Sequence, residues 1–221
     1  MNAPAASPPA TKKGEETRDR ILAAATELIH AQGFKETGLN DILAASGVPK
    51  GSFYHYFPSK EDLGRELLVR YRREAREYLE REAFPPTGEV IPRFVRFFEE
   101  SARQQTEGGC KAGCLLGNLA AEITNIHEDL RREVAQCFRE LGEVFADALE
   151  RGQRTGELAG DFAPDAAAEF LVSVMEGSIL LAKARREPAA FAGVQASLIR
   201  YLASLQNPAR TVDAPRSGGL A

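Results

Sequence analysis

The chain has 221 residues, 43% of them hydrophobic, so it is long enough to bury a substantial core in one or two domains. A net charge of -4 excludes a general cationic field, and any nucleic-acid contact must come from a local face. No apolar run approaches the ~18 residues of a membrane span, and MNAPAASPPATKKGEETR lacks the apolar core of a signal peptide. We expect a soluble cytoplasmic protein with no membrane partner.

Apolar residues recur at helical spacing along most of the chain, and the sequence shows neither sustained strand alternation nor an Asn-Gly hairpin turn. The Pro- and Ala-rich residues 1–14 and the tail 207–221 are predicted to be disordered. Helical segments are predicted within residues 18–34, 39–47, 49–57, 59–84, 90–105, 114–126, 129–154, 165–186 and 189–205. This pattern predicts an all-α fold of about nine helices.

The stretch LNDILAASGVPKGSFYHYF predicts two short helices joined by a tight turn. Gly47 supplies the left-handed backbone that the turn needs, and Pro49 suits the first turn of the second helix. Phe53 and Phe57 are four residues apart and share a face, which we expect to be buried with Ile42 and Val48. These features indicate a helix-turn-helix.

The opposite face of the second helix carries small, polar and basic side chains that suit close approach to a DNA groove. Tyr54 and Tyr56 can alternatively be ordinary boundary residues, and we expect His55 to pack against the scaffold rather than to read a base. The nearby Lys12 and Lys13 can form either a groove-binding arm or a solvated tail.

GFKETGLNDILAAS followed by GVPKGSFYHYFPSKEDL resembles the DNA-binding segment of TetR-family transcriptional regulators over residues 15–65. The resemblance implies an all-α homodimer that binds a pseudo-palindromic double-stranded DNA operator. It also implies a DNA-binding domain at residues 15–62, which is a three-helix helix-turn-helix domain. Residues 63–206 then form a larger C-terminal helical domain for effector binding and dimerisation.

By family position, the resemblance assigns DNA contacts to Asn40, Lys50, Gly51, Ser52, Tyr54, Tyr56 and Lys60. Lys60, at the start of the fourth helix, corresponds to a phosphate contact. Ser59 and Asp62 are spaced as a capping box for that helix. Gly38 departs from the family pattern, because a Ser or Thr usually begins the second helix, and a hydroxyl contact to DNA is not expected there.

The segment GGCKAGCLLGNLAAEIT carries two of the three cysteines, Cys110 and Cys114. They fall on one helix face if the helix starts early, and a helix N-terminus with Lys111 nearby favours a thiolate. The alternative is that the cysteines are small core residues. An odd count does not indicate a disulfide scaffold, and scattered His30, His127 and Cys137 do not give zinc spacing, so we expect no metal and no cofactor.

The motif GCLLGNLAAE resembles a segment of the NemR- and AcuR-like branch of the TetR family. The resemblance implies that Cys114 senses electrophiles or oxidants, with Cys110 as a resolving thiol. Cys137 lies within the predicted helix EVAQCFRELGEVF among core-type neighbours, so we expect it to be a packing residue. Gly117 gives room for close packing or for a ligand, and Asn118 in the same motif joins the expected effector site. Lys183 either stabilises a thiolate or an acidic effector, or extends into solvent.

Two late segments carry apolar stripes that can join two subunits in a four-helix interface. The stripes comprise Phe170, Val174 and Ile179 in the first segment, and Leu198, Tyr201, Leu202 and Leu205 in the second. The alternative for each residue is the core of its own subunit.

These observations favour a ligand- or electrophile-responsive DNA-binding regulator, which we expect to be a repressor that releases its operator. The alternative is a thiol-dependent enzyme that acts on small electrophiles. The sequence has no nucleophile elbow, phosphate loop, dinucleotide fingerprint or His-Glu-x-x-His motif, and only three histidines are available for general-base chemistry. We therefore expect that the protein is not an enzyme.

Overall fold

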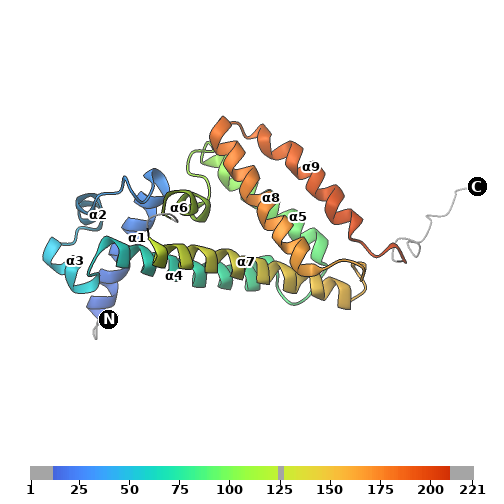
Figure 1. Cartoon of the computed structure of the whole chain (residues 1–221), viewed down its shortest axis with the longest axis horizontal. Helices are drawn as coiled ribbons and strands as arrows, with labels where there is room; N and C mark the ends of the chain where they lie inside the picture. Colours follow the sequence, from blue (N-terminus) through green and yellow to red (C-terminus); the bar gives the residue numbers. More distant parts are fainter. Residues whose placement is uncertain (1–11, 124–126, 210–221) are drawn as a thin grey trace, which may run out of the picture. The chain divides into compact units, whose positions relative to one another are not determined.

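The computed structural model describes residues 12–123 and 127–209, and over these ranges the chain is helical without a named strand (Figure 1). The helices are α1 (Lys12–Gln32), α2 (Leu39–Ser46), α3 (Lys50–Tyr56), α4 (Lys60–Tyr78), α5 (Val90–Glu107), α6 (Leu115–Ile123), α7 (Glu128–Arg154), α8 (Pro164–Arg185) and α9 (Ala189–Ser204). A π-helical turn, η1 (Leu79–Ala83), follows α4, and an isolated bridge pairs Leu158 with Gln206. The predicted all-α fold is confirmed.

The chain divides into two compact units. The first joins Met1–Glu74 with Lys111–Phe138, and the second joins Ala75–Cys110 with Arg139–Ala221. Two divisions fall inside α4 and α7, and the third follows Cys110, between α5 and α6. This arrangement differs from the expected boundary after residue 62, because α6 and the start of α7 group with the N-terminal helices.

At both ends of the described chain, ordered structure extends further than the sequence predicted. Helix α1 begins at Lys12, so residues 12–14 of the expected disordered arm are helical, and residues 1–11 lie outside the described residues. At the other end, the Asn207 N–H donates to the Glu157 carbonyl at 2.9 Å. The predicted tail therefore begins with an ordered residue, and its residues 210–221 lie outside the described ranges.

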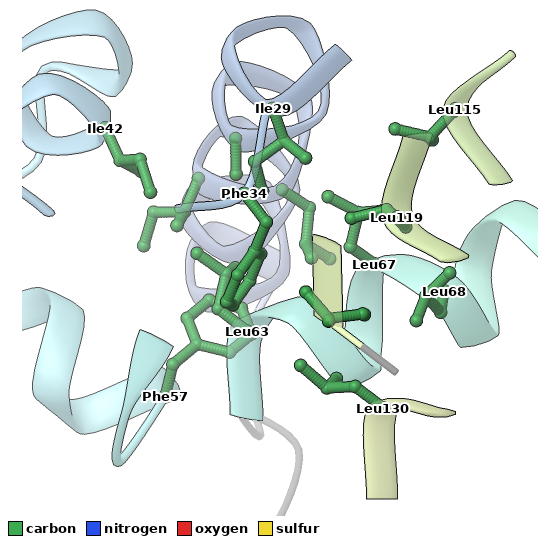
Figure 2. Packing of buried hydrophobic residues seen from close by; sticks show 14 of the residues in the cluster. Ile29, Phe34, Ile42, Phe57, Leu63, Leu67, Leu68, Leu115, Leu119 and Leu130 are labelled. Carbon is green, nitrogen blue, oxygen red and sulfur yellow. The ribbon is translucent and has the colours of Figure 1, made fainter. Parts of the chain in front are cut away.

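Apolar side chains from α1, α4 and α6 form the core of the first unit around Phe34 (Figure 2). Helix α1 ends at Gln32, and the following Gly33 has a φ of 94° and donates its N–H to the Ile29 carbonyl at 2.8 Å. A residue with a β-carbon rarely adopts that backbone, and glycine lets the chain turn so that Phe34 enters the core. Phe34 is only 3% exposed to solvent.

The second unit is built on a cluster of phenylalanines from α5, α7 and the residue after η1: Phe84, Phe94, Phe97 and Phe145. The buried Glu157 carboxylate accepts the backbone N–H groups of Val90 and Ile91 at 2.7 to 2.9 Å. These amides belong to the first turn of α5, where a negative charge is favoured by the helix dipole. Glu157 thus caps α5 from the loop that follows α7.

Helices α5, α8 and α9 lie against one another in the second unit (Figure 1). The expected dimer stripes are corrected in part, because Ile179, Leu198, Leu202 and Leu205 are buried within the chain itself. The large apolar residues that remain exposed on α8 and α9 are Phe170, Leu180, Leu181 and Ile199. Among the described helices, none is long and apolar enough to cross a membrane.

Candidate DNA-binding site

Helices α2 and α3 are joined by a short turn whose geometry agrees with the sequence prediction. Gly47 closes α2 in the left-handed region with a φ of 65°, and Val48 donates its N–H to the Leu43 carbonyl at 3.3 Å. Pro49 precedes α3, and its carbonyl accepts the Phe53 N–H at 3.1 Å. The two helices therefore form the predicted helix-turn-helix.

The inner face of this unit is apolar. Ile42, Val48, Phe53 and Phe57 are each at most 3% exposed, and all four belong to the core of the first unit. The Phe53 and Phe57 ring centres lie 5.6 Å apart. This packing holds the outer face of α3 in a fixed orientation, as the four-residue spacing predicted.

The outer face of α3 presents most of the residues expected to contact DNA. Lys50 and Gly51 are exposed, Tyr54 is 48% exposed, and Ser52 and Tyr56 are half-buried. A β-carbon added to Gly51 would meet no protein atom within 4 Å, so packing inside the protein does not require glycine there. The bare backbone instead leaves space for a partner to approach the helix.

His55 corrects one expectation, because it is exposed and does not pack into the scaffold. Its ring meets the edge of Tyr56, with 5.1 Å between the ring centres. Tyr56 in turn packs against the core of the first unit. His55 therefore lies on the accessible surface beside the predicted contact residues.

The start of α2 uses backbone and carboxylate groups in place of a hydroxyl cap. Asp41 accepts the Gly38 N–H at 3.1 Å, and the side chain of Asn40 is exposed. Thr37, which the sequence analysis did not single out, is fully buried and donates its hydroxyl to the Gly33 carbonyl at 2.6 Å. Thr37 fixes the turn that leads into α2.

Ser59 caps α4, as the sequence predicted, and Lys60 is the first residue of that helix. The Asp62 N–H donates to the Ser59 hydroxyl oxygen at 3.0 Å, and that hydroxyl donates to the Asp62 carboxylate at 2.7 Å. The Lys60 ammonium donates to the Lys35 carbonyl at 3.4 Å and lies 4.6 Å from the centre of the Phe34 ring. Desolvation by burial lowers the pKa of Lys60, and nearby carboxylates, led by Glu61, oppose that shift.

The two cysteines of the predicted thiol site are placed differently from the expectation. Cys110 is buried with a φ of 53° and belongs to the second unit, whereas Cys114 is half-buried and belongs to the first. Helix α6 begins only at Leu115, because left-handed backbone at Gly109, Cys110 and Gly113 interrupts the helical path. The prediction that both thiols share one helix face is wrong.

Cys114 directly precedes α6, and its carbonyl accepts the Asn118 N–H at 2.9 Å. The Asn118 side-chain amide donates to the Ala112 carbonyl at 2.8 Å, which ties α6 to the segment before it. Gly117 is half-buried within α6. Buried Cys137 has its sulfur 3.9 Å from the Leu68 carbonyl, in keeping with a packing residue.

Lys183 is half-buried on α8, in the second unit, and so belongs to a different compact unit from Cys114. That unit has an open hollow of about 730 Å³, lined by Tyr78, Glu82, Ala83, Glu89, Pro92, Arg93, Arg96, Phe97 and Glu100. Its volume falls in the range of small-molecule pockets. Within residues 12–123 and 127–209, no group of three or more His, Cys, Asp or Glu side chains can hold a metal ion.

Residues 21–67 match the family described as "Bacterial regulatory proteins, tetR family", and residues 90–198 match "Tetracyclin repressor-like, C-terminal domain". The transcriptional repressor DhaR of Mycobacterium sp. (strain GP1) is 31% identical over 76% of this chain and 83% of its own length. The transcriptional repressor NemR of Escherichia coli (strain K12) is 32% identical, over 77% of this chain and 86% of that repressor. The transcriptional regulator AcuR of Cereibacter sphaeroides is 32% identical over 76% of this chain and 77% of its own length.

Solved structures agree with these relationships. The reduced form of E. coli NemR superposes with a TM-score of 0.76 and 28% identity, covering 87% of this chain and 99% of that one. The regulatory protein TetR from Rhodobacter sphaeroides gives a TM-score of 0.76 and 29% identity, covering 84% of this chain and 98% of that one. The chain therefore belongs to the TetR family of transcriptional regulators, and its similarity to NemR and AcuR supports the predicted branch. It is a ligand-responsive DNA-binding regulator.

Proposed function

We propose that this regulator is a homodimeric repressor that binds a pseudo-palindromic operator and releases it when an effector binds or a thiol is modified. The observation that carries the proposal is the outer face of α3, where Lys50, Gly51 and Tyr54 are exposed above buried Phe53. A lysine supplies phosphate attraction, and exposed backbone and phenol groups suit close contact with a groove.

A two-fold dimer supports recognition of a pseudo-palindrome, because each subunit brings one recognition helix to one half-site. The exposed apolar side chains of α8 and α9 support dimerisation through these helices. Phe170 and Leu181 are 45% and 42% exposed and lie on one side of α8, since their spacing completes about three helical turns. Burial of such residues between subunits removes apolar surface from water.

Release requires an effector that binds the DNA-free conformation better than the DNA-bound one. The hollow beside η1 and α5 supports a small-molecule site, because it combines the aromatic side chains of Tyr78 and Phe97 with the guanidinium groups of Arg93 and Arg96. Arg93 donates to the Thr87 carbonyl at 2.7 Å. The position of Cys114 supports thiol modification as a second route to operator release, because its half-buried thiol precedes a helix in the same compact unit as α3.

The proposal is tested by footprinting the purified protein on a library of promoter fragments. We expect protection of a sequence with two related half-sites, and sequence-independent binding alone would contradict the proposal. Lys60→Ala should weaken binding at every sequence and reduce the slope of log affinity against log salt by about one. Exposed Arg73 is the matched control, because Arg73→Ala removes one charge from α4 about 20 Å away along the helix.

A further inference from the structure

Glu122, near the end of α6, lies against the turn between α1 and α2. Its carboxylate accepts the Lys35 N–H at 3.2 Å. A β-carbon added to Gly33 would lie 2.5 Å from one oxygen of the same carboxylate, so glycine allows Glu122 to approach the backbone closely. The turn and the end of α6 are thus in direct contact within the first unit.

The Lys35 backbone also holds Lys60. The Lys35 N–H donates to Glu122, while its carbonyl accepts the Lys60 ammonium at 3.4 Å. One peptide segment therefore connects a carboxylate of α6 with the lysine at the start of α4. Glu122 is also one of the carboxylates that oppose the effect of burial on the pKa of Lys60.

Helix α6 contacts the N-terminal helices at its other end as well. The His30 ring nitrogen Nε2 lies 2.9 Å from the carbonyl oxygen of Gly113, just before α6. Asn118 and Glu122 are four residues apart and so lie on one side of α6, and the Asn118 N–H donates to the carbonyl of Cys114, which directly precedes the helix. A displacement of α6 that begins near Cys114 would therefore reach the Gly33–Lys35 turn through Glu122.

We propose that Glu122 is a positioning residue for operator binding. It holds the Lys35 backbone in place, Lys35 holds Lys60, and the position of α6 thereby controls the phosphate contact that Lys60 makes. This inference rests on the proposed function for its effect on DNA, while the link between Glu122 and the turn exists without DNA.

The link is tested first on the DNA-free protein, by measuring amide hydrogen exchange at Lys35. Glu122→Ala should accelerate exchange at Lys35 about tenfold, because the amide loses a charge-assisted acceptor. Glu122→Gln retains an oxygen acceptor and should exchange within about threefold of the parent. Equal exchange in the parent and Glu122→Ala would overturn the link, whether or not the protein binds an operator.

The effect on DNA is tested by operator affinity at several salt concentrations. Glu122→Ala should weaken binding about fivefold to tenfold and lower the salt slope by about one, whereas Glu122→Gln should stay within about twofold of the parent. Glu36→Ala is the matched control, because Glu36 is exposed and also acts on Lys60 through charge. Glu36→Ala should not weaken binding.

A double-mutant cycle separates positioning from general destabilisation. If Glu122 acts through Lys60, Glu122→Ala should change affinity less than about twofold in a Lys60→Ala background. An undiminished loss in that background would overturn the proposal, as would equal losses in Glu122→Ala and Glu122→Gln. If the parent protein protects no operator, the proposed function fails, and the exchange experiment alone decides whether Glu122 holds the turn.

Discussion

The ammonium of Lys60 lies 4.6 Å from the centre of the Phe34 ring, so the cation rests against the core of the first unit. Cation–π attraction and nearby carboxylates favour the charged form, yet burial lowers the pKa of Lys60 overall. The expected phosphate contact therefore carries a cost in folding stability. Functional residues often show this conflict between activity and stability.

The first prediction concerns pH and Lys60. Because the pKa of Lys60 in the folded protein lies below its ordinary value of 10.5, the unfolded chain binds more protons between these two pKa values. The free energy of unfolding of the parent minus that of Lys60→Met should therefore increase as the pH rises across this interval. Urea denaturation of both proteins at successive alkaline pH values measures the difference. A constant or falling difference would contradict the prediction.

The second prediction separates the two faces of α3. Tyr54→Ala should change the free energy of unfolding by less than about 1 kcal/mol, because Tyr54 is 48% exposed, but it should weaken operator binding and blur the footprint. Phe53→Ala should cost about 3–5 kcal/mol, since Phe53 is fully buried. Urea denaturation and footprinting measure the two effects.

Tyr78→Ala is the control for Tyr54→Ala, because Tyr78 is 46% exposed on α4 in the second unit. Because Tyr78 lines the proposed effector hollow, both variants are measured without effector, and Tyr78→Ala should then leave operator binding unchanged. If Phe53→Ala does not fold, Phe53→Leu should still show a smaller loss of stability, in the region of 1 kcal/mol. Equal losses of affinity in the Tyr54 and Tyr78 variants would argue against a specific contact from Tyr54.

The third prediction concerns the thiol switch. After treatment with a mild electrophile or oxidant, the parent should release the operator, whereas Cys114→Ser should remain bound. Cys137→Ser should behave like the parent, because buried Cys137 is predicted to be a packing residue. Operator affinity and mass analysis of modified residues measure the outcome, and continued turnover of the electrophile would instead favour an enzyme.

Under this hypothesis Cys110 is the partner of Cys114, and the two thiols neither share a helix face nor belong to the same compact unit. A disulfide between them would appear as a mass loss that reduction reverses. If Cys114→Ser releases DNA as readily as the parent, a reversible non-covalent effector becomes the better explanation.

The fourth prediction concerns dimerisation. Phe170→Glu should convert the dimer to a folded monomer, because Phe170 is 45% exposed and a charge there opposes burial between subunits. Tyr78→Glu is matched in exposure at 46% and should leave the dimer intact. Sedimentation at several protein concentrations measures the association. A persistent dimer of Phe170→Glu would place the interface elsewhere.

Local signals in the sequence were enough to predict much of the fold. Gly47 and Pro49 set the end of α2 and the start of α3, and Ser59 sets the start of α4, through interactions with close neighbours in the chain. The spacing of Phe53 and Phe57 predicted their burial. The exposed side of α3 followed from the same periodicity, and its role as the recognition helix stays a prediction.

Contacts between distant residues were not predictable in this way. Glu122 meets Lys35 across 87 positions, and Glu157 meets Val90 across 67, with no repeating pattern to announce either pair. Left-handed backbone at Cys110 was unexpected because that conformation is uncommon for residues other than glycine. The apolar pattern of α9 could not distinguish burial of Leu198 within the subunit from burial against a partner.

The loop that caps α5 also forms hydrogen bonds with the segment that follows α9. Asn207 donates its side-chain amide to the Gly156 carbonyl at 3.1 Å, and Ala159 donates its N–H to the Leu205 carbonyl at 2.9 Å. Expression fragments should therefore retain Asn207, because truncation before it would remove its hydrogen bonds to the Glu157 loop and destabilise the start of α5. Purification handles and fluorescent fusions are better attached beyond Ala209, where these bonds stay intact.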